Sequence, residues 1–184
     1  MSSQPPSSPK RGRPARLSRE AIAAAALELD VETLSMNAVA DRLGVAKSSL
    51  YGWVSSREEL LGLVSDAVIE RCLPAEDPVD GDWRSWLAQL ARSMRREILT
   101  VPGYALRLSG THQHYSDAFD RLRDKVIAVF RQAGLARGPA TQSWYVFSTA
   151  MVGWLALEHQ HTTERPAPRF ESFLAVLLRG LPAS

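Results

Sequence analysis

Apolar residues recur with a helical period along most of this 184-residue chain. Met36, Val39, Ala40 and Leu43, for example, stand at positions i, i+3, i+4 and i+7, which places them on one face of a helix. The sequence lacks a sustained two-residue alternation of apolar and polar positions with hairpin turns, the pattern typical of strands. The periodicity therefore predicts an all-α fold of about nine helices.

Serine residues mark several helix starts, because a serine hydroxyl at the N-cap accepts a hydrogen bond from an otherwise unpaired backbone N–H group. Ser18, Ser35 and Ser56 stand at such positions, and Glu59 follows Ser56 with the spacing of a capping box. Pro and Asp gather in residues 74–82, which we expect to form a loop. The expected helices cover residues 19–29, 36–43, 46–53, 56–72, 83–99, a short segment after Pro102, 116–132, 139–158 and 169–181.

Residues 35–53 have the pattern of a helix-turn-helix. Gly44 follows the last apolar residue of the first helix and can adopt the left-handed backbone that begins a tight turn. Cations and hydroxyl groups on the second helix suit a DNA groove, because they can bind phosphates and base edges. The alternative is a pair of short helices in an ordinary bundle. The residues expected to face outward toward DNA are Lys47, Ser48, Ser49, Tyr51 and Trp53.

The N-terminal arm is basic, with Lys10, Arg11, Arg13 and Arg16 before the first acidic residue, Glu20. The whole chain has a formal net charge of only +2, from 22 basic and 20 acidic residues, so this positive charge is local. The run Arg-Gly-Arg-Pro resembles AT-hook peptides, and such an arm can lie in a minor groove. We therefore expect Arg11 and Arg13 to contact DNA; a solvated tail is the alternative.

The loop at residues 74–82 indicates three parts: a flexible basic arm (1–16), a DNA-binding head (17–72) and a second helical part (73–184). Residues 139–158 and 169–181 are apolar on several sides and need partners on more than one side. We expect these two helices to form a homodimer through an intersubunit four-helix bundle. A monomer core is the alternative.

Other classes of protein find less support in the sequence. The only cysteine is Cys72, and no apolar run reaches about 18 residues, so we expect a cytoplasmic protein without a membrane span. Neither a glycine-rich phosphate loop nor a nucleophile elbow is present, so we expect no enzyme and no cofactor. We also expect no metal site from the two H-x-H pairs, His112 with His114 and His159 with His161, since i and i+2 point to different sides of a helix.

Residues 17–69 resemble the DNA-binding domain of TetR-type transcriptional regulators. The similarity rests on residues 25–29, 39–45, 49–51 and 58–61, and residues 102–108 and 144–158 are similar to the ligand-sensing domain of the Tet repressor branch. The resemblance implies a homodimeric repressor that binds a palindromic operator and is released by a small molecule. It also implies DNA contacts by Met36, Asn37 and Arg57. The sequence departs from the family at residues 30–33, which look about two residues short, and at Gly52.

A small-molecule site is expected between the helices of the second part, because apolar walls with a few polar tips suit such ligands. The place at which the Tet repressor contributes a histidine is here Cys72 and Leu73, so an effector other than tetracycline is expected. A DNA-binding regulator or architectural protein without an effector remains the alternative. The candidate ligand-binding residues are Trp83, Trp86, Tyr104, His112, Phe119, Phe147 and Met151.

Overall fold

A computed structural model describes residues 17–78, 81–109, 116–160 and 169–181. Within these ranges the regular elements are nine α-helices and no strand, which confirms the predicted all-α fold. The same ranges contain no helix that is both long enough and apolar enough to cross a membrane.

Three short helices form the head: α1 (Arg19–Leu27), α2 (Met36–Leu43) and α3 (Lys47–Leu50). The hydroxyl of Ser18 accepts a hydrogen bond from the Ala21 amide at 3.1 Å, and that of Ser35 accepts one from the Ala38 amide at 3.2 Å. Both predicted N-caps are therefore present. The starts of α1 and α2 are thus set by serine hydroxyl groups that the sequence shows directly.

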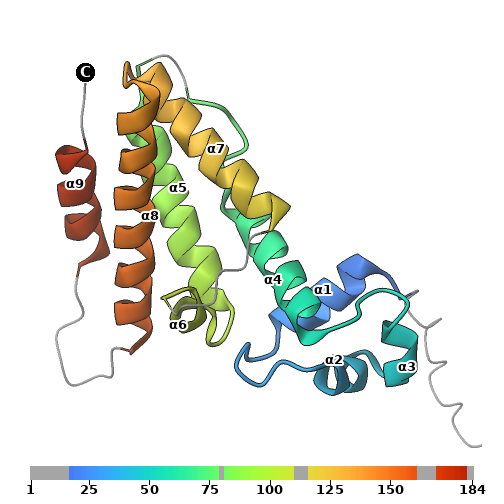
Figure 1. Cartoon of the computed structure of the whole chain (residues 1–184). Coiled ribbons are helices and arrows are strands. Elements are labelled where there is room, and N and C mark those ends of the chain that lie inside the picture. Colours follow the sequence, from blue (N-terminus) through green and yellow to red (C-terminus); the bar gives the residue numbers. More distant parts are fainter. Residues whose placement is uncertain (1–16, 79–80, 110–115, 161–168, 182–184) are drawn as a thin grey trace, which may run out of the picture.

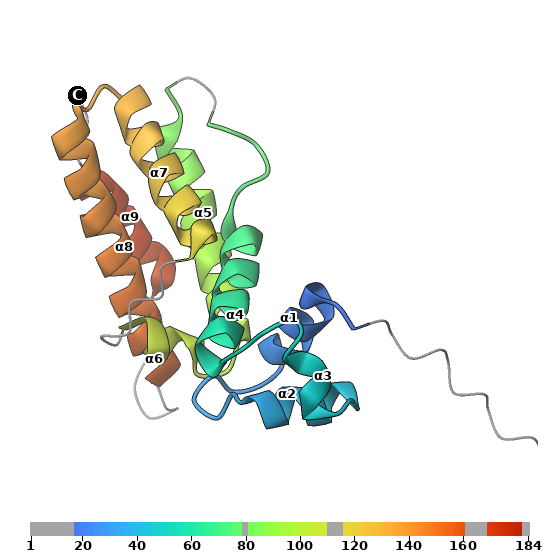
Figure 2. The same cartoon turned by 45° about the vertical axis from the view of Figure 1, so that its right-hand side comes forward.

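The remaining chain forms α4 (Arg57–Cys72), α5 (Trp83–Thr100), α6 (Tyr104–Ser109), α7 (Asp117–Gln132), α8 (Arg137–Gln160) and α9 (Phe170–Gly180). Helix α4 leads from the head into a bundle that contains α5, α7, α8 and α9, and α6 lies at the base of this bundle (Figure 1). Figure 2 shows the head below and to the side of the bundle, with α4 packed between them. One continuous set of buried apolar side chains runs through both parts.

Helices α3 and α8 differ from the predicted spans for local reasons. Helix α3 ends at Leu50, and residues 51–53 form turns instead of continuing the helix to Trp53. Gly52 lies in this segment, and glycine lowers helix stability. Helix α8 begins at Arg137, ahead of the predicted start at Pro139, because proline is tolerated in the first turn of a helix.

Candidate nucleic-acid interface and regulatory core

Helix α3 presents the predicted outward residues together. Leu50 is fully buried, whereas Lys47, Ser48 and Ser49 are exposed. Tyr51 and Trp53 continue this surface just beyond the helix and are 52% and 40% exposed. The Lys47 ammonium lies 5.9 Å from the centre of the Tyr51 ring, within range of a cation–π interaction. A cation, two hydroxyl groups and two large aromatic side chains thus share one solvent-facing surface.

The turn that leads into α3 has the predicted left-handed glycine. Gly44 has φ +67°, and its N–H group bonds to carbonyl oxygens at the end of α2. The Val45 amide then donates to the Ala40 carbonyl at 3.0 Å. These bonds close the end of α2 and orient α3, so the backbone of the helix-turn-helix is set by Gly44 and its neighbours.

The two residues at the start of α2 have different environments. Asn37 is exposed and available to a ligand. Met36 is only 7% exposed and belongs to the hydrophobic core of the head, with Val39 and Ala40 on the same face. Met36 therefore packs in the core of the head, because the apolar face that predicts the helix also turns this side chain inward, and its expected DNA contact stays a prediction.

Arg57 bonds to the backbone of the head, and its expected phosphate contact stays a prediction. Its Nε donates to the Leu34 carbonyl at 2.7 Å, and one Nη donates to the carbonyls of Val31 and Glu32 at 2.8 and 3.1 Å. The guanidinium thus holds the loop between α1 and α2 against the start of α4. These three acceptors are distant in sequence, so the pattern around Arg57 gave no signal of this role.

A second arginine that the sequence did not single out supports the DNA-facing surface. Arg19, at the start of α1, donates to the Trp53 carbonyl and to a Glu59 carboxylate oxygen, each at 3.2 Å. Hydrogen bonds from the Ser55 backbone and hydroxyl, with a smaller contribution from Arg19, lower the pKa of Glu59. These contacts anchor the segment that carries Tyr51 and Trp53 to the first turns of α1 and α4.

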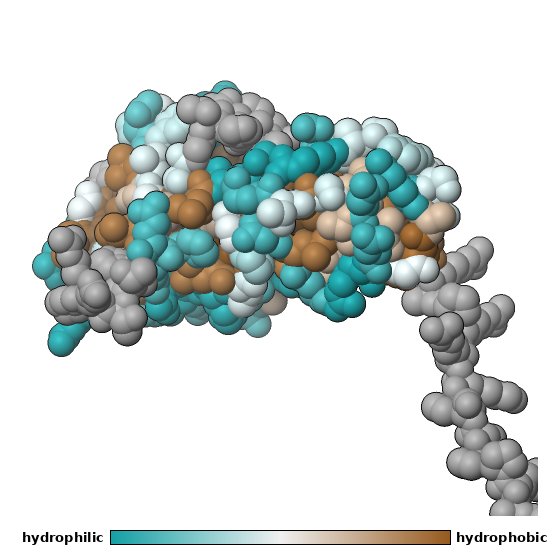
Figure 3. Space-filling model, turned by 90° about the horizontal axis from the view of Figure 1, so that it is seen from below, coloured by the Kyte–Doolittle hydropathy of each residue, from teal (hydrophilic) through white to brown (hydrophobic). Residues whose placement is uncertain are grey.

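The underside of the molecule carries hydrophilic side chains interleaved with hydrophobic ones over the head, at the right of Figure 3. Such a mixed surface is what DNA contacts require, because phosphates need polar donors and thymine methyl groups need apolar contacts. Arg11 and Arg13, expected in the minor groove, lie outside the described residues.

The candidate ligand-binding residues fall at separate places in the bundle. Trp83 begins α5 and packs against Phe130, with ring centres 5.7 Å apart. Tyr104 follows the other end of α5, so the two are separated by roughly 25 Å along the helix at about 1.5 Å per residue. The structure therefore does not bring Trp83 and Tyr104 to one small-molecule site.

Three of the remaining candidates, Trp86, Phe147 and Met151, are buried in the bundle. Phe147 and Met151 of α8 are fully buried, and Phe119 of α7 makes an edge contact with Trp144 at 5.9 Å. Trp86 is buried and its indole N–H donates to the Glu76 carbonyl at 2.9 Å. His112 lies outside the described residues.

Two titratable groups of the interior have perturbed acidity. Burial raises the pKa of the Tyr104 hydroxyl to about 12, an effect that a hydrogen bond with Ser65 partly opposes. Burial also raises the pKa of the Cys72 thiol to about 12, with a smaller contribution from Glu97. Both groups are therefore protonated at neutral pH, and the Cys72 thiol lacks the thiolate character of a reactive cysteine.

In the part of the chain that the structure describes, no group of three or more His, Cys, Asp or Glu side chains is arranged to hold a metal ion. His159 is exposed near the end of α8, and the other three histidines fall outside the described ranges. The H-x-H pairs therefore stay untested.

The outer faces of α8 and α9 carry uncovered apolar side chains. Tyr145, Val146 and Leu157 of α8 are each about half exposed, while Val176 of α9 is 67% exposed. Gly153 lies on the same side of α8, and a Cβ atom added there would meet nothing within 4 Å. This surface is suited to close approach by another helix.

An exposed polar and aromatic recognition surface on a helix-turn-helix head, joined to a helical bundle, defines a DNA-binding regulator. The profile of the family described as "Tetracyclin repressor-like, C-terminal domain" matches residues 73–184. The chain therefore belongs to the TetR family of transcriptional regulators. Members of this family are ligand-responsive DNA-binding repressors, and this chain is a transcription regulator of that kind and not an enzyme.

Relatives of known sequence span both parts of the chain. The class C tetracycline repressor protein of Escherichia coli is 30% identical over 173 residues, covering 91% of this chain and 78% of that protein. The class D tetracycline repressor protein of the same species is 28% identical over 178 residues, covering 91% of this chain and 79% of that protein.

Solved structures share the fold at lower sequence identity. The TetR family protein ActR of Streptomyces coelicolor, in complex with (S)-DNPA, has a TM-score of 0.68 at 22% identity, covering 92% of this chain and 90% of that one. BioQ with its double-stranded DNA operator has a TM-score of 0.69 at 22% identity, covering 90% of this chain and 98% of that one.

Proposed function

We propose that this chain is a homodimeric repressor that binds a palindromic operator through α3 and is released when a small molecule binds the helical bundle. The observation that carries this proposal is the solvent-facing set of Lys47, Ser49, Tyr51 and Trp53 on a head held by α4 to the bundle. A regulator of this kind acts where the DNA is, and we place it in the cytoplasm. The functional division is a head at residues 17–72 and a regulatory part at residues 73–184.

Operator recognition is assigned to the exposed residues of the helix-turn-helix. Lys47 and Ser48 at the start of α3 are assigned to phosphate contacts, because ammonium and hydroxyl groups donate hydrogen bonds to the phosphate oxygens of DNA. Tyr51 and Trp53 offer large surfaces to base edges and thymine methyl groups. Asn37 adds a bidentate polar group from the start of α2. Arg11 and Arg13 are proposed to follow the adjacent minor groove.

Dimerisation is assigned to the uncovered faces of α8 and α9. Val146 and Leu157 lie eleven residues, or about three turns, apart on one face of α8, and Tyr145 stands beside Val146. Val176 is an exposed apolar side chain of α9. Clusters of exposed large apolar side chains mark interaction sites in otherwise water-facing surfaces. Two copies related by a two-fold axis would place their recognition helices about 34 Å apart, one turn of B-DNA, as a palindrome requires.

Ligand release requires a path from the bundle to the head. Helix α4 packs against α1 on one side and against α5 and α7 on the other, so a shift of α4 moves the head relative to the bundle. Phe147 and Met151 are fully buried, which means that an effector would have to part packed side chains and thereby displace their neighbours. A coupling free energy of about 1–3 kcal/mol would lower operator affinity about 5- to 150-fold.

The test is selection of DNA from a pool of random duplexes by the purified chain, followed by sequencing. Recovery of a palindrome is expected, and the triple variant Lys47→Ala, Tyr51→Ala, Trp53→Ala should lose the enrichment. Arg131→Ala, an exposed residue on α7, is the matched control and should retain it. If the wild-type chain recovers only salt-sensitive binding without a shared sequence, the proposal of operator recognition is wrong. Small molecules are then screened for release of the selected duplex.

A further inference from the structure

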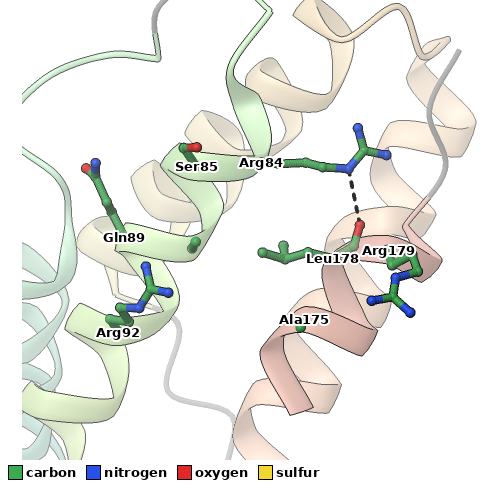
Figure 4. Close-up of a pocket in the computed structure, with 8 residues that line it drawn as sticks. Arg84, Ser85, Gln89, Arg92, Ala175, Leu178 and Arg179 are labelled. Carbon is green, nitrogen blue, oxygen red and sulfur yellow. Dashed lines mark hydrogen bonds between the residues drawn. The ribbon is translucent and has the colours of Figure 1, made fainter. Parts of the chain in front are cut away.

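A groove between α5 and α9 lies on the side of the bundle, away from the head. It encloses about 660 Å³ and is lined by residues of both helices. Figure 4 shows its two walls, with Arg84 extending from α5 toward the end of α9. The lining residues are Arg84, Ser85, Ala88, Gln89, Arg92, Ala175, Leu178 and Arg179.

Positive charge dominates the lining. Arg84, Arg92 and Arg179 contribute three guanidinium groups, and no acidic residue is among the lining residues. Glu171, a neighbour on α9, occupies Arg92 through two hydrogen bonds of 3.0 and 2.7 Å. Within the described ranges, neither Arg84 nor Arg179 forms an ion pair. The groove therefore retains two cationic groups that are not neutralised by a neighbouring carboxylate.

Arg84 is held in position at the rim. Its guanidinium carbon lies 4.1 Å from the centre of the Trp83 ring, and its Nε donates to the Leu178 carbonyl at 3.4 Å. The hydrogen bond uses Nε alone, so it leaves the terminal amino groups of Arg84 able to bind a carboxylate. Orientation of a guanidinium before binding lowers the entropic cost of pairing it with a carboxylate.

Apolar side chains also line the groove. They are Ala88 of α5 and Ala175 and Leu178 of α9. Ser85 and Gln89 provide neutral donors and acceptors along the α5 wall. This combination accommodates a segment that carries carboxylates on its edges and an apolar side chain between them.

The open form of the groove favours a protein segment over a small molecule. Ser85, Gln89, Arg92, Ala175 and Arg179 are all exposed, so a small ligand would leave much of its own surface in water. Small-molecule sites bury most of their ligand, whereas clusters of arginine on a surface recognise acidic segments of other proteins. We infer that this groove binds an acidic segment of a partner protein, with carboxylates taken by Arg84 and Arg179.

The test is fluorescence anisotropy with a short fluorescein-labelled peptide that carries two glutamate pairs around a central leucine pair. The full chain is expected to bind this peptide, and to bind its glutamine counterpart far more weakly. Binding should weaken as salt rises, because exposed charges are screened over about 10 Å at 0.1 M ionic strength. Absence of binding to the acidic peptide at low salt, or equal binding of both peptides, overturns the inference.

Variants separate the groove from general attraction to a basic surface. The double variant Arg84→Gln, Arg179→Gln is expected to lower peptide affinity by roughly 5- to 10-fold, since exposed ion pairs are individually weak. Arg71→Gln, Arg131→Gln removes the same charge from exposed positions outside the groove and should leave affinity unchanged. Equal loss in both double variants would show non-specific attraction and would contradict the inference.

Two further outcomes would assign the groove to another occupant. If free glutarate displaces the labelled peptide at the same concentration as unlabelled peptide does, the groove is a small-anion site. If Arg84→Gln, Arg179→Gln changes the dissociation of the dimer in sedimentation, the groove belongs to the contact between copies of the chain. Retention of the dimer, together with loss of peptide binding, supports the inference and does not depend on operator binding.

Discussion

The backbone amide of Val31 in the head donates a hydrogen bond of 3.1 Å to the carbonyl oxygen of Pro102 in the bundle. Val31 lies in the loop between α1 and α2, and Pro102 lies in the turn between α5 and α6. Gly103 follows with φ +73°, and the space that a Cβ atom would need there is occupied by the side chains of Asp30 and Val31. This contact joins the two parts of the chain at a point separate from α4.

Gly103→Ala tests this connection. An added Cβ atom would lie 2.7 Å from Asp30 Oδ1, which also accepts a hydrogen bond from the Glu32 amide at 2.8 Å. The carboxylate cannot move away without losing that bond, and the left-handed backbone costs about 1–2 kcal/mol for a residue with a side chain. We expect urea denaturation to show a loss of at least this size, with weaker operator binding.

Gly138→Ala is the control for that substitution. Gly138 lies in the first turn of α8, and an added Cβ atom there would meet nothing within 4 Å. Alanine at this position should leave stability unchanged or raise it slightly, because glycine is the weaker helix former. Equal stability of both variants would show that the turn at Gly103 adapts without strain and that the head is not coupled through it.

Arg57→Gln is expected to destabilise the head through its loop. The substitution removes charged donors from the carbonyls of Leu34, Val31 and Glu32. Hydrogen bonds to charged groups contribute about 1.5–3 kcal/mol, so a loss of this order in the free energy of unfolding should follow. The salt dependence of DNA binding should remain unchanged. A flatter salt dependence with intact stability would instead assign Arg57 to a phosphate.

Lys47→Ala, in contrast to Arg57→Gln, should change the salt dependence of DNA binding and leave stability unchanged. Lys47 is exposed at the start of α3, so its removal should leave stability almost unaltered. If it neutralises one phosphate, the slope of log affinity against log salt should become smaller by about one. The measurement is a salt titration of binding to the selected operator, with Arg131→Ala as the control. An unchanged slope would place Lys47 away from the phosphates.

The sequence predicted those features that depend on neighbouring residues. Ser18, Ser35 and Ser56 each accept the expected hydrogen bond from the backbone amide three residues ahead. Gly44 ends α2 in the left-handed conformation, as expected for a glycine that directly follows the last apolar residue of the helix. These are local preferences, so the residues themselves carry enough information to locate the helices.

The roles of individual side chains were harder to predict because they depend on contacts between distant segments. Arg57 lies at the start of a helix in the sequence, but its acceptors are more than twenty residues away. Met36 satisfies both an apolar pattern and a family position for DNA contact, and the structure buries its side chain in the head. Trp83 and Tyr104 share an aromatic character that suits a pocket, yet the length of α5 separates them. The spacing of residues along the chain does not predict such contacts between distant segments.

Alkaline pH is expected to destabilise the bundle through Tyr104 and Cys72. Burial raises the pKa of each group to about 12, above ordinary values of 10.0 and 9.0. A folded-state pKa above the unfolded value means that stability is full below the unfolded pKa and falls as pH rises toward the folded one. The loss should therefore begin near pH 9 and continue to about pH 12. Thermal unfolding across this range measures it.

Tyr104→Phe identifies the contribution of the tyrosine to this loss. Phenylalanine removes the ionisable hydroxyl and keeps most of the ring packing, so the decline in melting temperature between pH 10 and pH 12 should be shallower than in the wild-type chain. Tyr51→Phe is the control, because Tyr51 is 52% exposed on the head and thermal unfolding is measured without DNA. A decline of the same steepness in wild-type and Tyr104→Phe chains would assign the alkaline loss to other groups.

Gly153→Arg is expected to prevent association of two chains. Gly153 lies on the exposed side of α8 near Leu157, where close approach of a second α8 would bury its backbone. An arginine there would place a charged side chain between the two helices, and burial of an unpaired charge is strongly unfavourable. Sedimentation velocity should show a monomer, and operator affinity should fall because one head contacts only half a palindrome. Ala128→Arg, at an exposed position of α7, should remain dimeric. A dimeric Gly153→Arg chain with wild-type operator affinity would move the dimer contact away from this face of α8.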